Sequence, residues 1–393
     1  MTELYNALYE RWRQAFDEFS RLDEYKAAGR TIRYADNFRF RLADYDPAGF
    51  PAGGPLTTER DAHSTMEHQY HLDDAGLPVF VSIASSNKYV SNRWQGFYRY
   101  TPDMVEYIEF NLDTKYPSSI ERVIRQHGKK TSYQRFSLNS RGTFNIPHDQ
   151  LDYKALFTEI ENYHYQAHRI ISADGFAAGG GLAPWLYNLA YDYLDTGELD
   201  TIRIIYTNGQ TRLTYVRADA AQSLEQLSDQ LARQLASLII DTLIANQTQQ
   251  PIALLALYYR TGRLWIPSLA TISQADKKEI LDHHKGKDVF QHLFISSGDE
   301  IDLDNSPIER LWVQFFGLVN NAEDAMPGVY MLRKTARLLT HGGLDGKLAV
   351  DDEFIAYALD GEFEINDLEQ ILPECGLSEA TLQKWREKKW FDN

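Results

Sequence analysis

Two histidines spaced four residues apart are the first residues in this sequence that could carry chemistry. His164 and His168 fall within residues 150–168, a segment whose pattern predicts a helix. Residues four apart share one helix face, which is the spacing that a pair of metal ligands needs. No third ligand is evident nearby in the sequence. We therefore predict no metal site, and a metal-dependent enzyme with these histidines in a site assembled from distant residues stays as an alternative.

A second histidine group is less suited to metal binding. His63, His68 and His71 surround Glu67. If this stretch is a strand, His68 and His71 point to opposite faces, because side chains alternate along a strand. The spacing also differs from the HisGluXXHis pattern of a helical zinc site. This group therefore predicts no metal centre.

Three further patterns fall short of a known site. The glycine-rich run at residues 174–184 lacks the spacing of a phosphate-binding loop, so we interpret it as a connecting loop. Cys375 is the single cysteine, so it cannot form an internal disulfide, and no base is paired with it in the sequence. Asp299, Asp302 and Asp304 resemble the start of a calcium loop, but the glycine and glutamate that complete such a loop are missing. The sequence thus predicts no catalytic residue and no cofactor.

Negative charge is the strongest chemical feature of the chain, and it is concentrated in one region. The formal net charge is −16, and residues 299–374 hold 17 Asp and Glu against 5 Lys and Arg, a net of −12. An acidic surface repels the phosphates of nucleic acid and attracts basic proteins. We predict that this region binds a basic protein partner and does not bind nucleic acid. The candidate partner-binding residues are Asp299, Glu300, Asp302, Asp304, Asp351, Asp352, Glu353, Glu362 and Glu364.

The elements that must position these residues are indicated by a weak internal repeat. Residues 105–139 and 186–219 each read as a helix, a LeuAspThr segment, and two strands joined by a tight turn. The turns are HisGly at 127–128 and AsnGly at 208–209, and AsnGly is the strongest short signal of a hairpin. The repeat therefore predicts two hairpins, each preceded by a helix.

Helices are also predicted after each hairpin. Residues 104–113 form the helix before the first hairpin, residues 150–168 follow it, and residues 223–246 follow the second. Ser223 and Gln226 form a capping-box pattern at the start of the last helix. Repeated hairpin–helix units predict an α+β fold with antiparallel sheets, followed by a helix-rich acidic C-terminal part.

The length of the chain, 393 residues, is sufficient for two domains. We predict an N-terminal α+β domain of residues 1–172, which holds the first unit of the repeat. A C-terminal α+β domain of residues 173–393 would hold the second unit and the acidic part.

An aromatic stripe marks the start of the chain. Residues 2–28 read as one helix, followed by a strand that begins at Thr31. The stripe recurs at helical spacing and favours packing in a core. If it were exposed instead, it could serve as the interface of an oligomeric scaffold protein, which is a second alternative function. Its members are Tyr5, Tyr9, Trp12, Phe16 and Phe19.

Targeting signals are missing from the sequence. No run approaches the ~18 consecutive apolar residues of a membrane-spanning helix, and the first residues lack the apolar core of a secretory signal. We expect a cytoplasmic protein that does not bind membranes.

Two segments give the sequence a resemblance to a known class of proteins. They read GFYRYTPDMVEYIEFNL (residues 96–112) and DDEFIAYALD (residues 351–360), the latter leading to a terminal KKWF. Both are similar to cytoplasmic immunity proteins of bacterial toxin systems, over about a third of the chain. The resemblance implies a protein that binds one cognate toxin and occludes its active site. It carries no diagnostic motif, so no functional residue is transferred from it.

Overall fold

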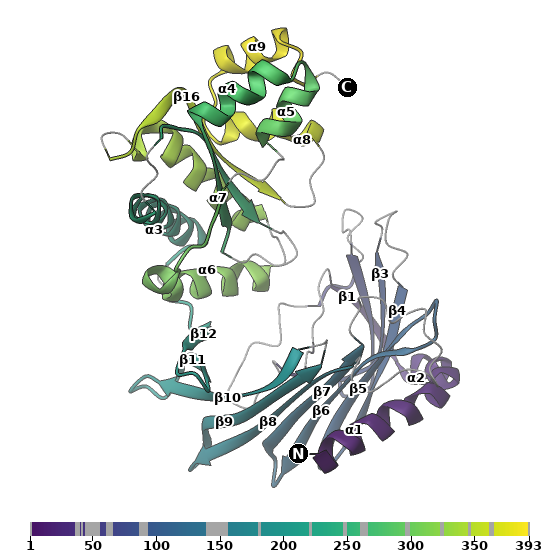
Figure 1. Ribbon diagram of the computed structural model, residues 1–393. Helices are drawn as coiled ribbons and strands as arrows, with labels where there is room; N and C mark the ends of the chain where they lie inside the picture. The colour runs from purple at the N-terminus through teal and green to yellow at the C-terminus, as the bar shows by residue number, and fades with distance from the viewer. Residues whose placement is uncertain are drawn as a thin grey trace. The chain divides into compact units, whose positions relative to one another are not determined.

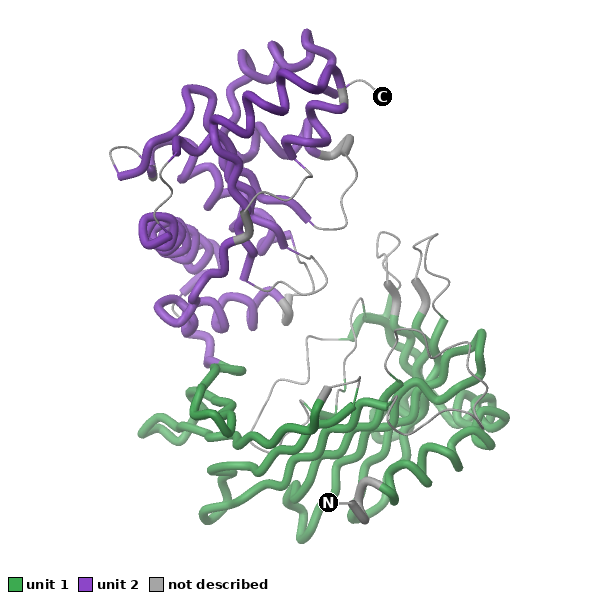
Figure 2. The backbone as a smooth tube through the Cα atoms, viewed as in Figure 1, with its two compact units in different colours: residues 1–215 green, residues 216–393 purple. Residues whose placement is uncertain are grey.

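The structure is a computed structural model, and its residues form two compact units, 1–215 and 216–393 (Figure 2). The boundary expected from the sequence, between residues 172 and 173, lies inside strand β9 (Arg169–Gly179). The residues that the structure describes are 2–35, 40, 42–43, 56–59, 66–85, 93–138, 156–179, 182–219, 222–246, 250–259, 266–294, 299–322, 326–344, 347–360 and 365–391.

Unit 1 is dominated by one antiparallel sheet, to which the described residues contribute twelve strands in chain order (Figure 1). Each inner strand pairs with the strand before it and the strand after it, so the sheet is a continuous meander. The strands are β1 (Thr31–Ala35), β2 (Met66–Leu72), β3 (Pro78–Ser85), β4 (Arg93–Thr101), β5 (Met104–Asn111), β6 (Pro117–Gln126), β7 (Lys129–Leu138), β8 (Leu156–Gln166), β9 (Arg169–Gly179), β10 (Leu182–Tyr193), β11 (Leu199–Tyr206) and β12 (Thr211–Val216).

This sheet shows that the predicted α+β fold of repeated hairpin–helix units was wrong. Strands β5 and β8 occupy two places where helices were expected. The repeat is a three-strand meander, with β5–β6–β7 in the first copy and β10–β11–β12 in the second. Both faces of β5 are covered, since Tyr107 and the adjacent Ile108 are each buried. A strand covered on both faces loses the polar–apolar alternation that distinguishes it from a helix.

The tight turns of the repeat are confirmed as hairpin turns. Between β6 and β7, His127 and Gly128 have φ values of 51° and 76°, as a type I′ turn requires at both central positions. Between β11 and β12, Gly209 has a φ of 83°, and its amide donates to the Tyr206 carbonyl (2.9 Å). Glycine suits both turns because it has no Cβ to clash at positive φ.

An N-terminal helical segment covers one face of the sheet, on the outer side of its curvature (Figure 1). Trp12 is fully buried there, and its indole nitrogen donates to the Pro117 carbonyl (3.0 Å). Phe16 and Phe19 pack against the same core, so this part of the aromatic stripe serves packing and does not form a free interface. The segment closely follows the single helix predicted over residues 2–28. It consists of α1 (Thr2–Ala15), the 3₁₀ helix η1 (Phe16–Arg21) and α2 (Leu22–Ala28).

Unit 2 combines a small sheet with helices (Figure 1). The described strands lie in the order β15–β14–β13–β16, and only β13 and β16 run parallel. The strands are β13 (Ile252–Tyr259), β14 (Ser268–Ser273), β15 (Asp299–Ile301) and β16 (Val350–Asp360). The helices are α3 (Leu224–Ala245), α4 (Gln274–His283), α5 (Lys287–Phe294), η4 (Ser306–Ile308), α6 (Glu309–Ala322), α7 (Met326–Leu338), η5 (Leu339–Gly343), α8 (Ile365–Glu374) and α9 (Glu379–Glu387).

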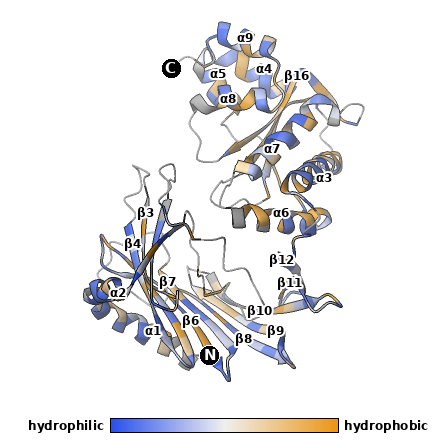
Figure 3. Cartoon of the chain, turned by 180° about the vertical axis from the view of Figure 1, so that it is seen from behind, coloured by the Kyte–Doolittle hydropathy of each residue, from blue (hydrophilic) through white to orange (hydrophobic). Residues whose placement is uncertain are grey.

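Helix α3 begins at the capping box predicted from the sequence. The Gln226 amide donates to Ser223 Oγ (3.2 Å), and the Ser223 amide donates to Gln226 Oε1 (3.0 Å). Leu231 and Leu235 of this helix are fully buried in the core of unit 2. Figure 3 shows hydrophilic residues beside hydrophobic ones on α3, as expected of a helix buried on one side.

A helix needs about 20 predominantly apolar residues to cross a bilayer. Within the described ranges of both units, no helix combines that length with enough apolar character.

Candidate binding surface

The predicted acidic residues of unit 2 fall into tracts that the sheet separates. Asp299 and Glu300 lie on β15 at one edge of the sheet, whereas Asp351 lies on β16 at the other edge. Strands β14 and β13 lie between these edges, so the sheet does not bring the two tracts side by side. Glu362 and Glu364 lie outside the described residues.

Part of the second tract is neutralised within the protein. Lys277 of α4 places its Nζ 2.8 Å from Asp351 Oδ1 and 3.6 Å from Glu353 Oε2. Burial acts to raise the pKa of Asp351, but the hydrogen bond from Lys277 and that from the Glu353 amide outweigh it and lower the pKa. Asp351 is therefore a structural ion-pair partner. Its neighbour Asp352 is exposed.

The residues after β15 are exposed, but one of them has a local role. Asp304 accepts hydrogen bonds from the Ser306 hydroxyl (2.6 Å) and the Ser306 amide (3.0 Å), and both lower its pKa. This arrangement orders the chain before η4. Asp302 is exposed, and together with Asp304 it presents negative charge next to the edge strand.

The histidines proposed for an assembled enzyme site do not share a helix. His164 lies on β8, and His168 lies in the turn that follows, so the predicted helical spacing was wrong. His164 Nε2 is 2.8 Å from Asp174 Oδ2 in an exposed pair. Among the residues that the structure describes, no group of three or more His, Cys, Asp or Glu side chains is arranged to hold a metal ion.

The other histidine group divides between the two faces of the sheet. His68 stacks near Tyr70, whereas His71 packs against Phe80 on the helix-covered face. The opposite orientation expected for a strand is confirmed for these two residues. His63 lies outside the described residues.

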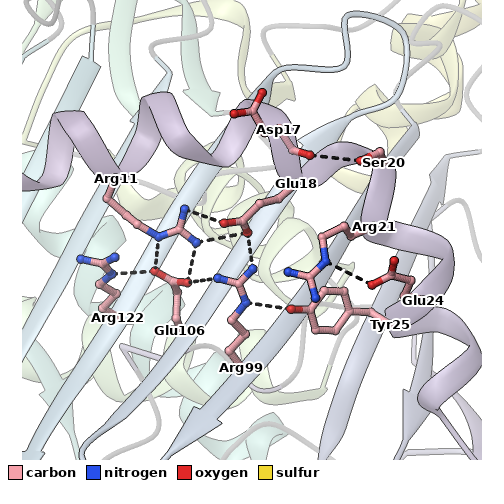
Figure 4. A network of polar contacts seen from close by, with 10 residues as sticks. All are labelled: Arg11, Asp17, Glu18, Ser20, Arg21, Glu24, Tyr25, Arg99, Glu106 and Arg122. Carbon is pink, nitrogen blue, oxygen red and sulfur yellow. Dashed lines mark hydrogen bonds and ion pairs between the residues drawn. The ribbon is translucent and has the colours of Figure 1, made fainter.

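A buried network of arginine and glutamate joins the helical segment to the sheet (Figure 4). Its centre is Glu106 on β5, whose side chain is 1% exposed. Arg11 of α1 binds Glu106 with two hydrogen bonds, Nε to Oε1 (2.9 Å) and Nη2 to Oε2 (2.7 Å). Arg122 of β6 donates to the same carboxylate from Nε (2.7 Å). Bidentate contacts of this kind are among the strongest charge-assisted hydrogen bonds.

The same network continues to the 3₁₀ helix. Arg99 of β4 lies 3.4 Å from Glu106 and donates to Glu18 (2.5 Å) and to the Tyr25 hydroxyl (2.8 Å). Burial acts to raise the pKa of Glu106, but the hydrogen bond from Arg11 and the charge of the neighbouring arginines lower it. Because its donors are occupied by the protein's own carboxylates, we interpret this network as structural.

The opposite face of the sheet carries a second set of charged residues, which we name the tyrosine–carboxylate surface. Strand register places its members on one face, because Tyr98, Tyr107, Glu121, Arg135 and Glu159 are direct neighbours across β4 to β8. Two further rows flank this one on opposite sides: Glu109 lies opposite Ser119 in one, and Tyr133 lies opposite Glu161 in the other. The members of the surface are Tyr98, Tyr107, Glu109, Ser119, Glu121, Lys130, Tyr133, Arg135, Glu159, Glu161, Tyr163 and Tyr187.

Tyrosine hydroxyls hold the carboxylates of this surface. Tyr187 donates to both Glu159 and Glu161 (3.2 Å each), and Tyr163 donates to Glu161 (2.5 Å). On β5, the Tyr107 hydroxyl donates to Glu109 Oε2 (3.1 Å). A neutral hydroxyl positions a carboxylate but does not cancel its charge.

Glycines allow these tyrosine rings to lie across the neighbouring strands. A Cβ on Gly96 would lie 2.5 Å from the Tyr107 ring, and a Cβ on Gly175 would lie 2.1 Å from the Tyr187 ring. Any larger residue would therefore displace the ring. These positions require glycine because the tyrosine rings approach the backbone closely, and not because the backbone has an unusual conformation.

Arg135 lies beside the carboxylates of this surface without a close ion pair among the described residues. Arg135 Nε lies 3.8 Å from Glu121 Oε1, beyond hydrogen-bond distance, and the Arg135 side chain is 42% exposed. Burial raises the pKa of Glu109 despite its hydrogen bonds. Burial and then the charge of Glu161 raise the pKa of Glu159. Burial therefore disfavours the ionised form of Glu109 and of Glu159.

Sequence reasoning missed this surface because it depends on strand assignment. The signal was present as Tyr107 with Glu109, Tyr133 with Arg135, and Glu161 with Tyr163, each pair two residues apart. Spacing of two places side chains on one face of a strand but not of a helix. Assigning helices to β5 and β8 removed the pattern.

No protein-family model matches this chain, and no curated protein matches it either.

Proposed function

We propose that this protein binds a basic protein partner and that, as an immunity protein does, it neutralises a cognate toxin by binding it. One observation supports the proposal most directly: residues 299–374 hold 17 Asp and Glu against 5 Lys and Arg, and the described ion pairs from outside the segment reach only Asp351, Glu353 and Glu369. Arg333 pairs with Glu374 (2.6 Å), and Lys334 pairs with Asp229 of α3. Two of the 5 Lys and Arg in the region are therefore already engaged with carboxylates.

Exposed carboxylates are the ones that we expect to face the partner. Asp302, Asp304 and Asp352 are exposed, whereas Asp351 is held by Lys277. Long-range attraction between a surface of this sign and a basic protein accelerates association more than it slows dissociation. Asp302, Asp304 and Asp352 therefore form the testable core of the proposed interface.

The first prediction concerns association with the protein encoded immediately upstream of this gene, which we take as the test partner. The triple variant Asp302→Asn/Asp304→Asn/Asp352→Asn should associate roughly tenfold more slowly at low salt and show a weaker salt dependence. Its dissociation rate should change little, because these side chains are exposed. Stopped-flow kinetics measures both rates, and co-expression with the partner measures protection of the cell.

A matched control removes three charges elsewhere in the same unit. Asp241, Glu279 and Asp282 are exposed residues of α3 and α4, and their amide variants should associate at the wild-type rate. Failure of the upstream product to bind, or equal rates for the two triple variants, would contradict the proposed function.

A further inference from the structure

We propose that Asn208, in the turn between β11 and β12, is a site of spontaneous modification at which the side-chain amide is lost and aspartate or isoaspartate forms. The folded turn delays this reaction, so the modification marks molecules in which the β11–β12 turn has opened. The proposal concerns unit 1 and holds whether or not unit 2 binds a basic partner.

The local sequence is the first reason. Asn208 and Gly209 form the single Asn–Gly pair of the chain. Deamidation of asparagine begins when the backbone nitrogen of the following residue loses its proton and attacks the side-chain carbonyl carbon. Glycine obstructs this attack least, because it has no side chain and its backbone rotates freely. Both residues are exposed, so the water that completes the reaction reaches them.

The reaction balances with water as its only co-reactant. The Gly209 nitrogen forms a bond to Asn208 Cγ, the bond from Cγ to Nδ2 breaks, and ammonia leaves with the proton that Gly209 gave up. The product is a cyclic succinimide, which water opens at one of its two carbonyl carbons. Attack at the side-chain carbonyl gives aspartate, and attack at the backbone carbonyl gives isoaspartate. Either product adds one negative charge to the turn.

The geometry of the turn does not require asparagine, which is the second reason. Residues 73–77 and 194–198 form turns of the same kind, in which a glycine at positive φ donates its amide to the carbonyl three residues earlier. Ala75 and Thr196 stand there in the position of Asn208. Such a turn needs the glycine at positive φ and accepts different residues before it. What Asn208 adds to its turn is therefore the carboxamide.

Hydrogen bonds hold both reacting groups in the folded turn. The Gly209 amide donates to the Tyr206 carbonyl (2.9 Å), so the proton that must leave is engaged. Asn208 Oδ1 accepts from the Gln210 amide (2.9 Å), and Asn208 Nδ2 donates to Gln210 Oε1 (3.0 Å). The carboxamide is thus fixed on the residue beyond Gly209. The reaction therefore proceeds from an open form of the turn, which is populated by local unfolding.

Peptide mapping by mass spectrometry tests the proposal on the full-length protein. The protein is kept at mildly alkaline pH in buffer and in concentrated guanidinium chloride, and conversion of Asn208 is followed over time. Conversion should be about tenfold or more faster in the denaturant, because the hydrogen bonds of the turn are lost there. Asn305, which precedes Ser306, is the reference within the same chain and should convert more slowly than Asn208 in the denaturant.

Two outcomes of this experiment would overturn the proposal. Equal rates of conversion at Asn208 in buffer and in denaturant would show that the folded turn gives no protection. Conversion of Asn208 no faster than that of Asn305 in the denaturant would show that the Asn–Gly pair is not a preferred site.

A pair of variants tests the protection in the folded state. Gln210→Ala removes the acceptor of Asn208 Nδ2 and keeps the backbone amide, so Asn208 should convert several-fold faster in buffer and at the wild-type rate in denaturant. Glu198→Ala is the matched control, because Glu198 holds the corresponding position in the turn at 194–198 and should leave Asn208 at the wild-type rate. Equal rates in these two variants in buffer would contradict the protection.

Gly209→Ala tests the route of the reaction. In denaturant the folded turn plays no part, so only the added methyl group distinguishes this variant from the wild type. Conversion of Asn208 should slow several-fold, because the methyl group obstructs attack by the backbone nitrogen. An unchanged rate would mean that water removes the amide directly, and it would overturn the proposal.

Discussion

His71 on β2 is a buried histidine whose surroundings favour the neutral ring. It is 6% exposed and packs edge-on against Phe80, with ring centroids 5.2 Å apart. A Cβ placed on Gly29 would lie 2.5 Å from the Cβ of His71, so the backbone at Gly29 approaches His71 closely. Burial lowers the pKa of His71, and the positive charge of Lys26 lowers it further. Protonation of this residue therefore opposes the folded state.

The second prediction is a loss of stability of unit 1 in mild acid that depends on His71. The pKa of His71 in the folded protein lies below the usual 6.5. The contribution of the neutral His71 ring to the stability of unit 1 is therefore complete above about pH 6.5, and it is lost as the pH falls through the folded pKa. The wild-type free energy of unfolding should thus fall relative to that of His71→Phe by up to ~1.4 kcal/mol per pH unit in this window.

Urea unfolding of unit 1 between about pH 7.5 and pH 5 checks this dependence. His164→Asn is the control, because it removes an exposed histidine of the same sheet. A constant difference between wild type and His71→Phe across the pH range would exclude the proposed protonation.

At the scale of elements, the network around Glu106 attaches a helical layer to the sheet. The contacts to Glu106 itself come from three elements, Arg11 from α1, Arg99 from β4 and Arg122 from β6. Loss of one member of a buried ion pair is costly, because the remaining charge stays buried without a partner. The attachment of the helical layer should therefore depend on Glu106.

The third prediction is that Glu106→Gln lowers the free energy of unfolding of unit 1 by roughly 3–5 kcal/mol, as for other broken buried pairs. Denaturant titration followed by tryptophan fluorescence, to which the buried Trp12 contributes, measures the loss. Glu24→Gln disrupts the exposed pair with Arg21 on the same segment and should leave the transition in place. Equal stability of Glu106→Gln and wild type would contradict a structural role.

Elements with a local signal could be predicted from the sequence. Helix α3 starts at Ser223 because its capping box is encoded within four residues, and the β6–β7 hairpin turns at His127 and Gly128 for the same reason. Strands β5 and β8 could not be predicted, because what covers their faces comes from residues far away in the chain. Trp12 packs over the sheet at Pro117, 105 residues later.

The candidate site was harder to predict than the elements. Glu121 and Arg135 become neighbours only through the register of β6 and β7, and Glu159 joins them through the pairing of β7 with β8. Acidic density in residues 299–374 was visible in composition, but composition could not show that Asp351 is held by Lys277. Strand register, strand pairing and ion pairs between distant residues are set by the tertiary structure.

At the scale of the whole molecule, each unit has hydrophobic cores of its own. One core lies within unit 2 and surrounds its small sheet, and two lie on the two faces of the large sheet in unit 1. Strand β12 ends at Val216 and helix α3 begins at Leu224, so a short connection separates the last strand of the large sheet from unit 2. A core of its own is what a segment needs to fold independently.

The fourth prediction is that residues 1–219 and residues 220–393 fold as separate proteins. Each fragment should show a cooperative thermal transition. The circular dichroism spectra of the two fragments should add up to the spectrum of the intact chain. The cut after residue 219 keeps β12 whole. An unfolded fragment of either kind would show that its core requires the other unit.

The strictly sequential order of the large sheet bears on how the chain is assembled during synthesis. Each strand from β2 to β12 pairs with the strand made just before it, so the growing sheet supplies a template for every strand that leaves the ribosome. The exception is α1, which is made before the sheet but binds β5 through Arg11 and Glu106, 95 residues apart. Helix α1 must therefore wait for its docking surface, and the middle of the sheet is completed before the helix can close over it.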